Sequence, residues 1–313
     1  MATITTKARS PISRIMRWLG LLFAGLLGLL LILSASIYIL SELRVQRIYT
    51  TTPAPIRIET SIASIQRGQH LVTSVMACVD CHGTDLAGKI VVDDPAIGRA
   101  VAANLTTGEG GIGRQFSDAD FVRAIRHGVK PDRHSLLVMP VDDYTALSEA
   151  DMAAIIAYIR SIPAVDNELP NSQIGPLGRI LLVIGQANLL SAETVPQHGG
   201  FPEAIPIGPT VDYGRYLART SGCMGCHGAT LSGGPIPGGP PGFPIPPNIT
   251  PAGAIQGWTD EQLRHAIREG TRPDGSQLNS FMPYQYYAGM TEEEIQAIIA
   301  YLRQVPAKPY GGR

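Results

Sequence analysis

ACVDCHGT at residues 77–84 and GCMGCHGA at residues 222–229 decide how this chain of 313 residues is interpreted. Each stretch places two cysteines three positions apart, with a histidine directly after the second cysteine. The chain has four cysteines, and all four lie in these two stretches. Three kinds of site use such a pattern: a zinc site, a redox-active dithiol and the covalent attachment of haem. The rest of the sequence has to discriminate among them.

The two stretches open an internal repeat. Cys78 and Cys223 lie 145 positions apart, and the Met-Pro pairs at 139–140 and 282–283 lie 143 apart. LSEADMAAIIAYIRSIP at 147–163 also matches MTEEEIQAIIAYLRQVP at 290–306. Because the features follow in the same order, the sequence predicts two homologous domains in tandem. We expect a first domain at 61–165, a connector with little structure at 166–207, and a second domain at 208–313.

Each domain has the pattern of a helical fold. Apolar residues recur at helical spacing in the segments 147–163 and 290–306, which predicts a terminal helix with one buried face. Another helix is expected before each cysteine motif, at 65–77 and at 211–222. No β pattern of any length appears, so the predicted fold class is all-α. Four residues have the positions of helix caps: Ser117 and Thr259 at the N-terminus, and Gly128 and Gly270 at the C-terminus.

The repeat discriminates among the three kinds of site. The two cysteine pairs occupy equivalent places in separate domains, which disfavours one shared Cys₄ zinc site. A redox dithiol is expected in a βαβ context, and the sequence predicts none. Haem attachment instead needs two thiols on one helical turn and an adjacent histidine to ligate the iron. The sequence therefore predicts covalent haem at Cys78, Cys81 and His82, and again at Cys223, Cys226 and His227.

A sixth iron ligand is expected from methionine. Met139 follows His82 by 57 residues and Met282 follows His227 by 55, each directly before a proline in a predicted loop. Packing in the core is the alternative role for a methionine, but its recurrence at the same place favours ligation. Surface or structural roles are predicted for the other histidines: His70, His127, His134, His198 and His265.

The N-terminal region predicts the compartment. Residues 18–40 form a run of 23 positions without charge, long enough to span a bilayer as a helix. Basic residues precede it, so the positive-inside rule predicts a cytoplasmic segment at 1–17, a transmembrane anchor at 18–40, a linker at 41–60 and exported domains. A cleaved signal peptide is the alternative, with Ser34-Ala35-Ser36 as a weak cleavage site. The length of the run favours an uncleaved, single-pass anchor in the plasma (inner) membrane.

Charge excludes nucleic acid as a partner. The chain has a net charge of −1, but residues 1–47 contain six basic side chains and one acid. The remainder therefore carries −6 and offers no basic patch for phosphates.

The chain resembles membrane-anchored dihaem cytochromes c built from two class I domains. The resemblance rests on CVDCH and CMGCH, on Asn-Leu-Thr at 104–106 and Asn-Ile-Thr at 248–250, on the Met-Pro pairs and on the terminal helices. It is most similar to cytochrome subunits of periplasmic alcohol and sugar dehydrogenases. The resemblance implies close contact of the first and last helices at Gly68 and Gly214, and places Asn104 and Asn248 near the haem propionates.

We therefore expect a chain with two covalently bound haem c groups that transfers single electrons on the periplasmic face. It would act as a carrier or as a subunit of a respiratory or dehydrogenase complex. The expected donor is a dehydrogenase or a quinol-oxidising complex, and the expected acceptor is an oxidase or another cytochrome. The alternative is a dihaem enzyme of the peroxidase or thiosulfate-oxidising kind. Such an enzyme needs an open iron position, whereas a methionine is available in both domains.

Overall fold

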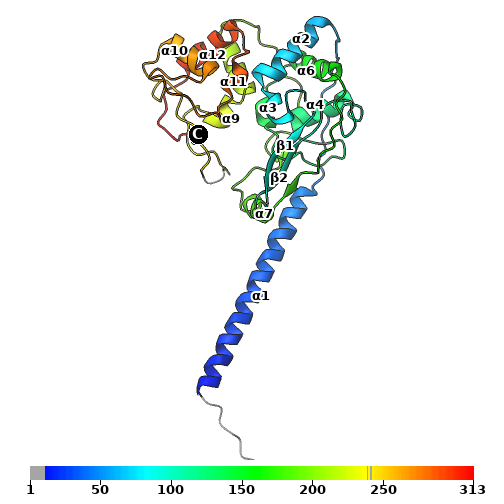
Figure 1. The fold of residues 1–313 in the computed structure, drawn as a ribbon, viewed down its shortest axis with the longest axis vertical. Coiled ribbons are helices and arrows are strands. Elements are labelled where there is room, and N and C mark those ends of the chain that lie inside the picture. Colours follow the sequence, from blue (N-terminus) through cyan, green and yellow to red (C-terminus); the bar gives the residue numbers. More distant parts are fainter. Residues whose placement is uncertain (1–10, 238, 240–241) are drawn as a thin grey trace, which may run out of the picture. The chain divides into compact units, whose positions relative to one another are not determined.

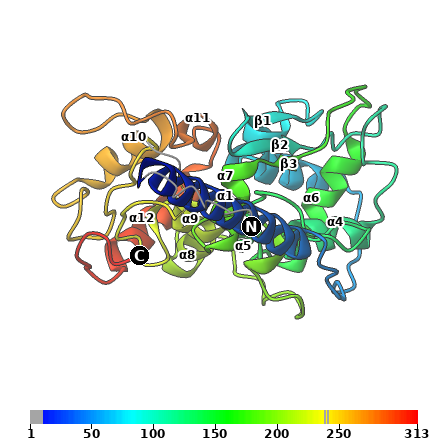
Figure 2. The same cartoon turned by 90° about the horizontal axis from the view of Figure 1, so that it is seen from below.

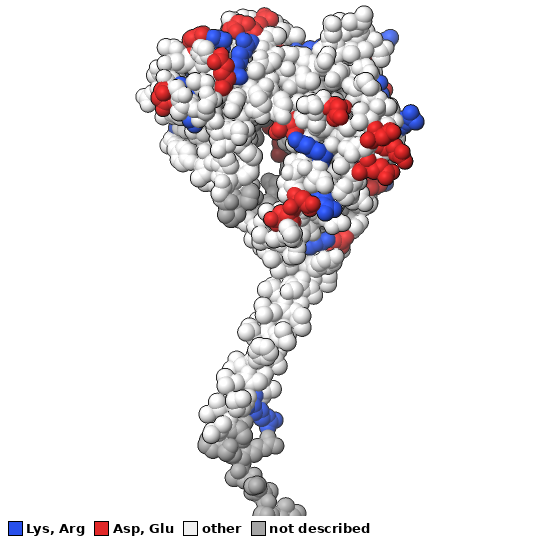
Figure 3. Space-filling view, in the orientation of Figure 1, with Lys and Arg blue, Asp and Glu red and all other residues white. Residues whose placement is uncertain are grey.

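The computed structural model describes residues 11–237, 239 and 242–313. It divides after Gln46 into two compact units. The first unit contains one long helix, α1 (Pro11–Val45). Its segment Arg14–Val45 is long and apolar enough to cross a membrane, as judged from length and composition. Figure 3 shows the middle of this helix free of Lys, Arg, Asp and Glu. The helix contains the predicted anchor at 18–40, while part of the predicted cytoplasmic segment 1–17 lies outside the described residues.

The second unit, residues 47–313, contains two similar sets of helices side by side (Figures 1 and 2). The elements of the first domain are α2 (Ile62–His70), the π-helical turn η1 (Leu71–Val75), α3 (Cys78–His82), α4 (Asp118–His127), α5 (Val141–Tyr144) and α6 (Glu149–Ser161). Those of the second domain are α8 (Val211–Thr220), α9 (Cys223–His227), α10 (Asp260–Glu269), α11 (Tyr284–Tyr287) and α12 (Glu292–Gln304). The order of helices is thus the one expected from the repeat.

The predicted helix caps are present. Ser117 accepts a hydrogen bond from the backbone N–H of Asp120, and Thr259 accepts one from that of Gln262, each within a reciprocal capping box. Gly128 ends α4 in the left-handed conformation, with φ +65°, and the same conformation ends α10. These caps satisfy backbone groups that a free helix end leaves without partners.

The first and last helices of each domain cross at a glycine, as expected. A Cβ atom on Gly68 would lie 1.9 Å from the carbonyl oxygen of Ala154, and one on Gly214 would lie 1.8 Å from that of Ala297. Only glycine allows the two backbones to approach so closely. The crossing buries the apolar stripes predicted for the terminal helices, so that Ile155, Ile156 and Ile298 lie in the core.

A small sheet departs from the all-α prediction. Strand β1 (Lys89–Asp94) pairs antiparallel with β2 (Gly98–Ala102), and β2 pairs with the short β3 (Gln173–Ile174). The hairpin turns at residues 95–97, and Gly98 begins β2 with φ +124°, where a Cβ would lie 2.2 Å from the carbonyl oxygen of Gln173. The strands are exposed or half-buried on both faces, so they show no alternation of apolar and polar residues. The β-branched run Ile90-Val91-Val92 was the available signal.

The connector is more ordered than expected. It contains β3, helix α7 (Pro176–Val183) and the 3₁₀ turn η2 (Ser191–Glu193). Helix α7 begins with a proline at its first position and ends in the apolar run Ile180-Leu181-Leu182-Val183. The backbone of Leu190 bridges to Leu137, and both Ala187 and Leu190 are buried. The prediction of little structure was therefore wrong, because contacts with the first domain order this segment.

A polar network joins the two domains. Arg67 donates to Asp151 through Nε at 2.9 Å and to Glu294 Oε1 through Nη1 at 3.2 Å. His70 Nε2 lies 2.7 Å from Glu294 Oε2, and the hydroxyl of Tyr216 donates to Asp151 Oδ2 at 2.5 Å. Asp151 and Glu294 hold equivalent positions on α6 and α12. The domains therefore meet with approximate two-fold symmetry, and each terminal helix offers its acid to the other domain.

Candidate functional site

The cysteines lie on two short helices of matching geometry. Helix α3 begins at Cys78 after Ala77, whose φ is +49°, and α9 begins at Cys223 after Gly222, whose φ is +81°. The left-handed residue turns the chain sharply into the helix, on which both cysteines and the histidine lie. All four thiols are free and half-buried.

The state of the thiols disfavours two of the three kinds of site. Burial raises the pKa of Cys78 to about 12 and that of Cys223 to about 11, so both thiols are protonated at neutral pH. A reactive dithiol needs a lowered pKa instead. Among the described residues, no three His, Cys, Asp or Glu side chains gather as metal ligands. The described side chains thus do not gather as zinc ligands, and the raised thiol pKa values do not favour a reactive dithiol.

The two histidines are oriented alike. His82 Nδ1 lies 2.8 Å from the carbonyl oxygen of Ala103, and His227 Nδ1 lies 2.8 Å from that of Pro247. A carbonyl oxygen only accepts, so Nδ1 carries the proton and the lone pair is left on Nε2. Burial lowers the pKa of both rings, which keeps them neutral. An iron-ligating imidazole has this tautomer, with its other nitrogen held by a backbone carbonyl. The donor set thus fits haem c.

The chain directly after each histidine forms a matching loop in the two domains. Gly88 N–H donates to the carbonyl of His82 at 2.7 Å, and Gly233 N–H donates to that of His227 at 2.8 Å. Leu86 and Leu231 both have φ +59° and are buried. Sequence reasoning missed Ala103 and Pro247, because a backbone carbonyl has no residue-type signature. The Asn-x-Thr segment directly after each was the available signal.

Asn104 and Asn248 are buried and clamp these loops. Asn104 Oδ1 accepts from Thr106 N–H at 2.9 Å, and its amide donates to the carbonyl of Val165 at 2.8 Å. Asn248 makes the same bond to Thr250 N–H at 2.8 Å and donates to the carbonyl of Lys308 at 2.7 Å. Each asparagine thus ties the histidine loop to the chain beyond the terminal helix. The placement of both asparagines near the haem propionates, which the resemblance implies, stays a prediction.

The two methionines lie in restrained loops at the edge of the core. Met139 and Met282 are half-buried, and each precedes a proline that caps a short helix, α5 or α11. The carbonyl of Met139 accepts from Ser191 Oγ at 2.9 Å. Met282 N–H donates to the carbonyl of Asn279 at 3.0 Å. Cys78 and Cys223 pack against the same core, so cysteine and methionine of each domain adjoin one apolar region.

Four of the five other histidines have partners elsewhere. His70 pairs with Glu294, His134 with Asp132, and His265 with two glutamates on its own helix. His127 Nδ1 lies 3.0 Å from the carbonyl oxygen of Pro196. Each of these four histidines has a partner within the chain, which fits the structural or surface role predicted from the sequence.

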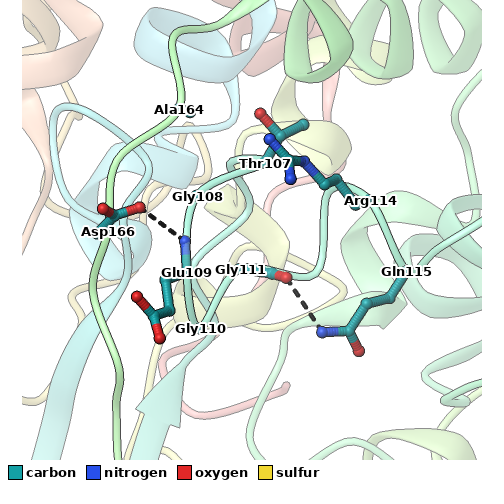
Figure 4. A pocket seen from close by; sticks show the side chains of 9 residues that line it. All are labelled: Thr107, Gly108, Glu109, Gly110, Gly111, Arg114, Gln115, Ala164 and Asp166. Atoms are coloured by element: carbon teal, nitrogen blue, oxygen red, sulfur yellow. Dashed lines mark hydrogen bonds between the residues drawn. The ribbon is translucent and has the colours of Figure 1, made fainter.

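A hollow in the first domain lies apart from the cysteines. It has a volume of about 530 Å³ and follows the glycine-rich loop after Thr106 (Figure 4). Figure 4 shows Asp166 accepting from the N–H of Glu109, at 2.8 Å, and Gln115 donating to the carbonyl of Gly111, at 3.3 Å. The hollow is lined by Thr107, Gly108, Glu109, Gly110, Gly111, Arg114, Gln115, Ala164 and Asp166. None of the eight predicted haem-binding residues lines the hollow, so it is separate from the predicted haem sites.

Known proteins resemble both halves of the chain. The sequence profile of cytochrome c matches residues 211–306, and that of cytochrome c oxidase, cbb3-type, subunit III matches residues 63–159. A fructose dehydrogenase cytochrome subunit of Gluconobacter japonicus is 29% identical over 80% of this chain and 54% of its own length. A gluconate 2-dehydrogenase cytochrome c subunit of Pantoea cypripedii is 29% identical over 79% of this chain and 60% of its own length.

A third relative has the expected number of haems in its name. It is a diheme cytochrome c-type protein of Cereibacter sphaeroides, 29% identical over 60% of this chain and 66% of its own length. The chain spans little more than half the length of the two dehydrogenase subunits. The matched profiles cover both repeats, each with its cysteine pair and oriented histidine. The chain therefore carries two cytochrome c domains.

Proposed function

We propose that the chain binds two haem c groups, one in the domain at 61–165 and one in the domain at 208–313. Cys78 and Cys81 would form the thioethers of the first site, with His82 and Met139 as iron ligands. In the second site, these roles fall to Cys223, Cys226, His227 and Met282. The observation that carries the proposal is the matched orientation of the two histidines, since both Nδ1 atoms lie 2.8 Å from a backbone carbonyl.

When bound, haem supplies an iron that alternates between the ferric and ferrous states. The protein residues do the rest. The cysteines fix the group covalently, the carbonyls of Ala103 and Pro247 hold the imidazoles with Nε2 available, and the buried surroundings exclude water. Met139 and Met282, as further iron ligands, would close the iron to small molecules, which supports electron transfer rather than catalysis at the iron.

We infer that the chain is the electron-transfer subunit of a membrane-bound dehydrogenase complex. Relatives named as cytochrome subunits of fructose and gluconate dehydrogenases support this role. The donor would be a dehydrogenase subunit, and the acceptor an oxidase or another cytochrome. The net charge of −6 on the chain after residue 47 supports docking to partners with basic patches.

Helix α1 would anchor the protein in the inner membrane as a single pass. Its basic flank at Arg14 and Arg17 supports a cytoplasmic N-terminus, with both haem domains in the periplasm. The exposed apolar surface along α1 supports burial in lipid, because such a surface is otherwise unfavourable in water.

Expression with a cytochrome c maturation system tests the cofactor assignment. We expect a mass increase of two haems that survives denaturation, and a loss of one haem in each double variant, Cys78→Ser/Cys81→Ser and Cys223→Ser/Cys226→Ser. Met139→Ala and Met282→Ala should each weaken the methionine–iron charge-transfer band. A chain that acquires no covalent haem would refute the assignment.

Purification from membranes in mild detergent tests the cellular role. A dehydrogenase subunit should copurify in a fixed ratio, and addition of its substrate should reduce both haems. Recovery of an isolated cytochrome that no dehydrogenase reduces would contradict the role as a subunit.

A further inference from the structure

The two cysteine helices meet the other domain at equivalent positions. Asp80 lies between Cys78 and Cys81, and its counterpart between Cys223 and Cys226 is Gly225. Asp143 is the third residue of α5, and its counterpart on α11 is Tyr286. In both domains, the short helix with this third residue begins directly after the Met-Pro pair.

The first contact runs from the second domain to the first. The hydroxyl of Tyr286 on α11 donates to Asp80 Oδ1 on α3 at 3.1 Å. Helix α11 also packs against η1, the turn that leads into α3 (Figure 1). There, a Cβ on Gly289 would lie 2.3 Å from Ser74 Oγ. The segment that follows Met282 is thus held by the cysteine helix of the other domain.

The second contact runs in the opposite direction. Helix α5 packs against α8 and α9 of the second domain. Asp143 is only 7% exposed, and a Cβ on Gly225 would lie 3.0 Å from Asp143 Oδ2. Gly225 therefore leaves the space that this carboxylate occupies. The segment that follows Met139 is in turn held by the cysteine helix of the second domain.

Two buried tyrosines connect each short helix to its own domain as well. The hydroxyl of Tyr287 on α11 donates to the carbonyl of Ser221, which precedes the second cysteine helix. Tyr144 on α5 is buried near Cys78 and Cys81 of its own domain and near Tyr287 of the other. Helices α5 and α11 therefore each lie close to the cysteine helices of both domains.

We propose that the two haem sites are coupled through these crossed contacts, in which the segment after the methionine of each domain sets the charge beside the cysteine helix of the other. Asp80, Tyr286, Asp143 and Gly225 are the positioning residues. A change at one site then alters the reduction potential of the other. This inference rests on the proposed function, because it requires a haem in each domain.

The contacts predict the sign of two substitutions. Tyr286→Phe removes the hydroxyl that donates to Asp80, so the carboxylate charge beside the first site is less balanced. A nearby negative charge favours ferric iron, and the potential of the first haem should fall. Asp143→Asn removes a carboxylate beside the second cysteine helix, so the potential of the second haem should rise. In both variants, the haem of the other domain should shift more than the haem of the substituted one.

Redox titration of the full-length holoprotein in detergent tests the coupling. The titration curve should have two steps, one for each haem. Titration of Met139→His and of Met282→His first assigns each step (wave) to its haem, since a bis-histidine haem has a lower potential than a His/Met haem. Tyr286→Phe and Asp143→Asn are then titrated at pH 8. Burial raises the pKa of Asp143 to about 7, so its carboxylate is ionised under these conditions. Asp142→Asn is the matched control, because it makes the same charge change on the exposed neighbouring residue of α5.

Shifts of the opposite domain's wave in both variants, with little change in Asp142→Asn, would support crossed coupling. Shifts confined to the substituted domain, or none, would overturn it. Mass spectrometry of each variant separates the two proposals. Two covalent haems without crossed shifts refute the coupling alone, whereas absence of covalent haem refutes the proposed function and with it the coupling.

Discussion

The two domains reach the same histidine geometry through different loops. In the first domain, residues 83–103 contain the hairpin of β1 and β2. This loop ends at Ala103, whose carbonyl oxygen is hydrogen-bonded to His82 Nδ1. In the second domain, residues 228–247 are rich in glycine and proline, and the described part of this loop contains no strand. It nevertheless ends with the carbonyl of Pro247 on His227 at the same distance.

What the domains share is therefore what the predicted cofactor needs. The glycine crossing, the left-handed leucine, the asparagine clamp and the helix caps recur in both domains. The hairpin, by contrast, is specific to the first domain and pairs with β3 of the connector. We infer that the repeated contacts maintain the sites, while the loops between cysteine and asparagine are free to differ. The predictions below test whether the repeated contacts are equivalent.

The largest effect is expected at the glycine crossings. Gly68→Ala and Gly214→Ala each place a Cβ within 2 Å of a backbone carbonyl oxygen, so the crossing helices must separate. We expect each to lower the free energy of unfolding by about 3 kcal/mol or more, measured by guanidinium denaturation. Gly208→Ala is the control, since its nearest contact would be at 3.8 Å. A crossing that tolerates alanine in one domain only would break the equivalence of the two.

The next largest effect is expected at Glu294 in the domain interface. Its carboxylate is 2% exposed and accepts from Arg67, His70 and Tyr213. Glu294→Gln leaves the Arg67 charge with Asp151 as its remaining acidic partner. We expect a loss of about 2 kcal/mol at pH 7, less than for a fully buried pair because Arg67 is partly exposed. Glu293→Gln on the exposed side of the same helix should change the free energy of unfolding little.

The stabilisation by Glu294 depends on pH. Burial alone raises the pKa of Glu294, but the hydrogen bonds from His70 and Thr291 and the charges of His70 and Arg67 outweigh it and lower the pKa below 4.5. A lowered pKa in the folded state means that the stabilisation is present above pH 4.5 and is lost as the pH falls through the folded value. The difference between wild type and Glu294→Gln, followed by urea denaturation, should therefore shrink below pH 4.5. A constant difference down to pH 3 would show that the charge of Glu294 contributes nothing.

Local patterns were predictable from the sequence, and non-local contacts were not. The order of helices and the caps at Ser117 and Thr259 follow from spacing within a few residues and from recurrence in the repeat, whereas the crossing at Gly68 was implied by the resemblance. The hairpin escaped prediction because its strands lack a buried face and because β2 also pairs with β3, about 75 positions away. The contacts between the two domains were not predicted either. Arg67 and His70 stand where the second domain has Tyr213 and Tyr216, so the repeat gives no sign that these positions share a role.

A third, intermediate effect tests the asparagine clamps. Asn104→Ala and Asn248→Ala each remove a buried amide that joins a backbone N–H to a carbonyl about 60 residues away. The groups left without partners should lower the free energy of unfolding by about 2 kcal/mol in each case. Similar losses in thermal or chemical denaturation would indicate that the clamp is equally important beneath the hairpin and beneath the proline-rich loop. A loss in the second domain alone would indicate that the hairpin and β3 hold Ala103 without Asn104.

The smallest effect is expected at the helix caps. Ser117→Ala and Thr259→Ala each remove one side-chain acceptor from a capping box, which costs about 1 kcal/mol. For a protein of this size, that loss corresponds to a fall of about 2–4 °C in the melting temperature. Ser117→Thr and Thr259→Ser keep the acceptor and should melt close to wild type. If either alanine variant has the same melting temperature as the variant that keeps the acceptor at that position, the hydrogen bond does not stabilise that helix. Its recurrence in both domains then reflects descent from one ancestral domain rather than present stability.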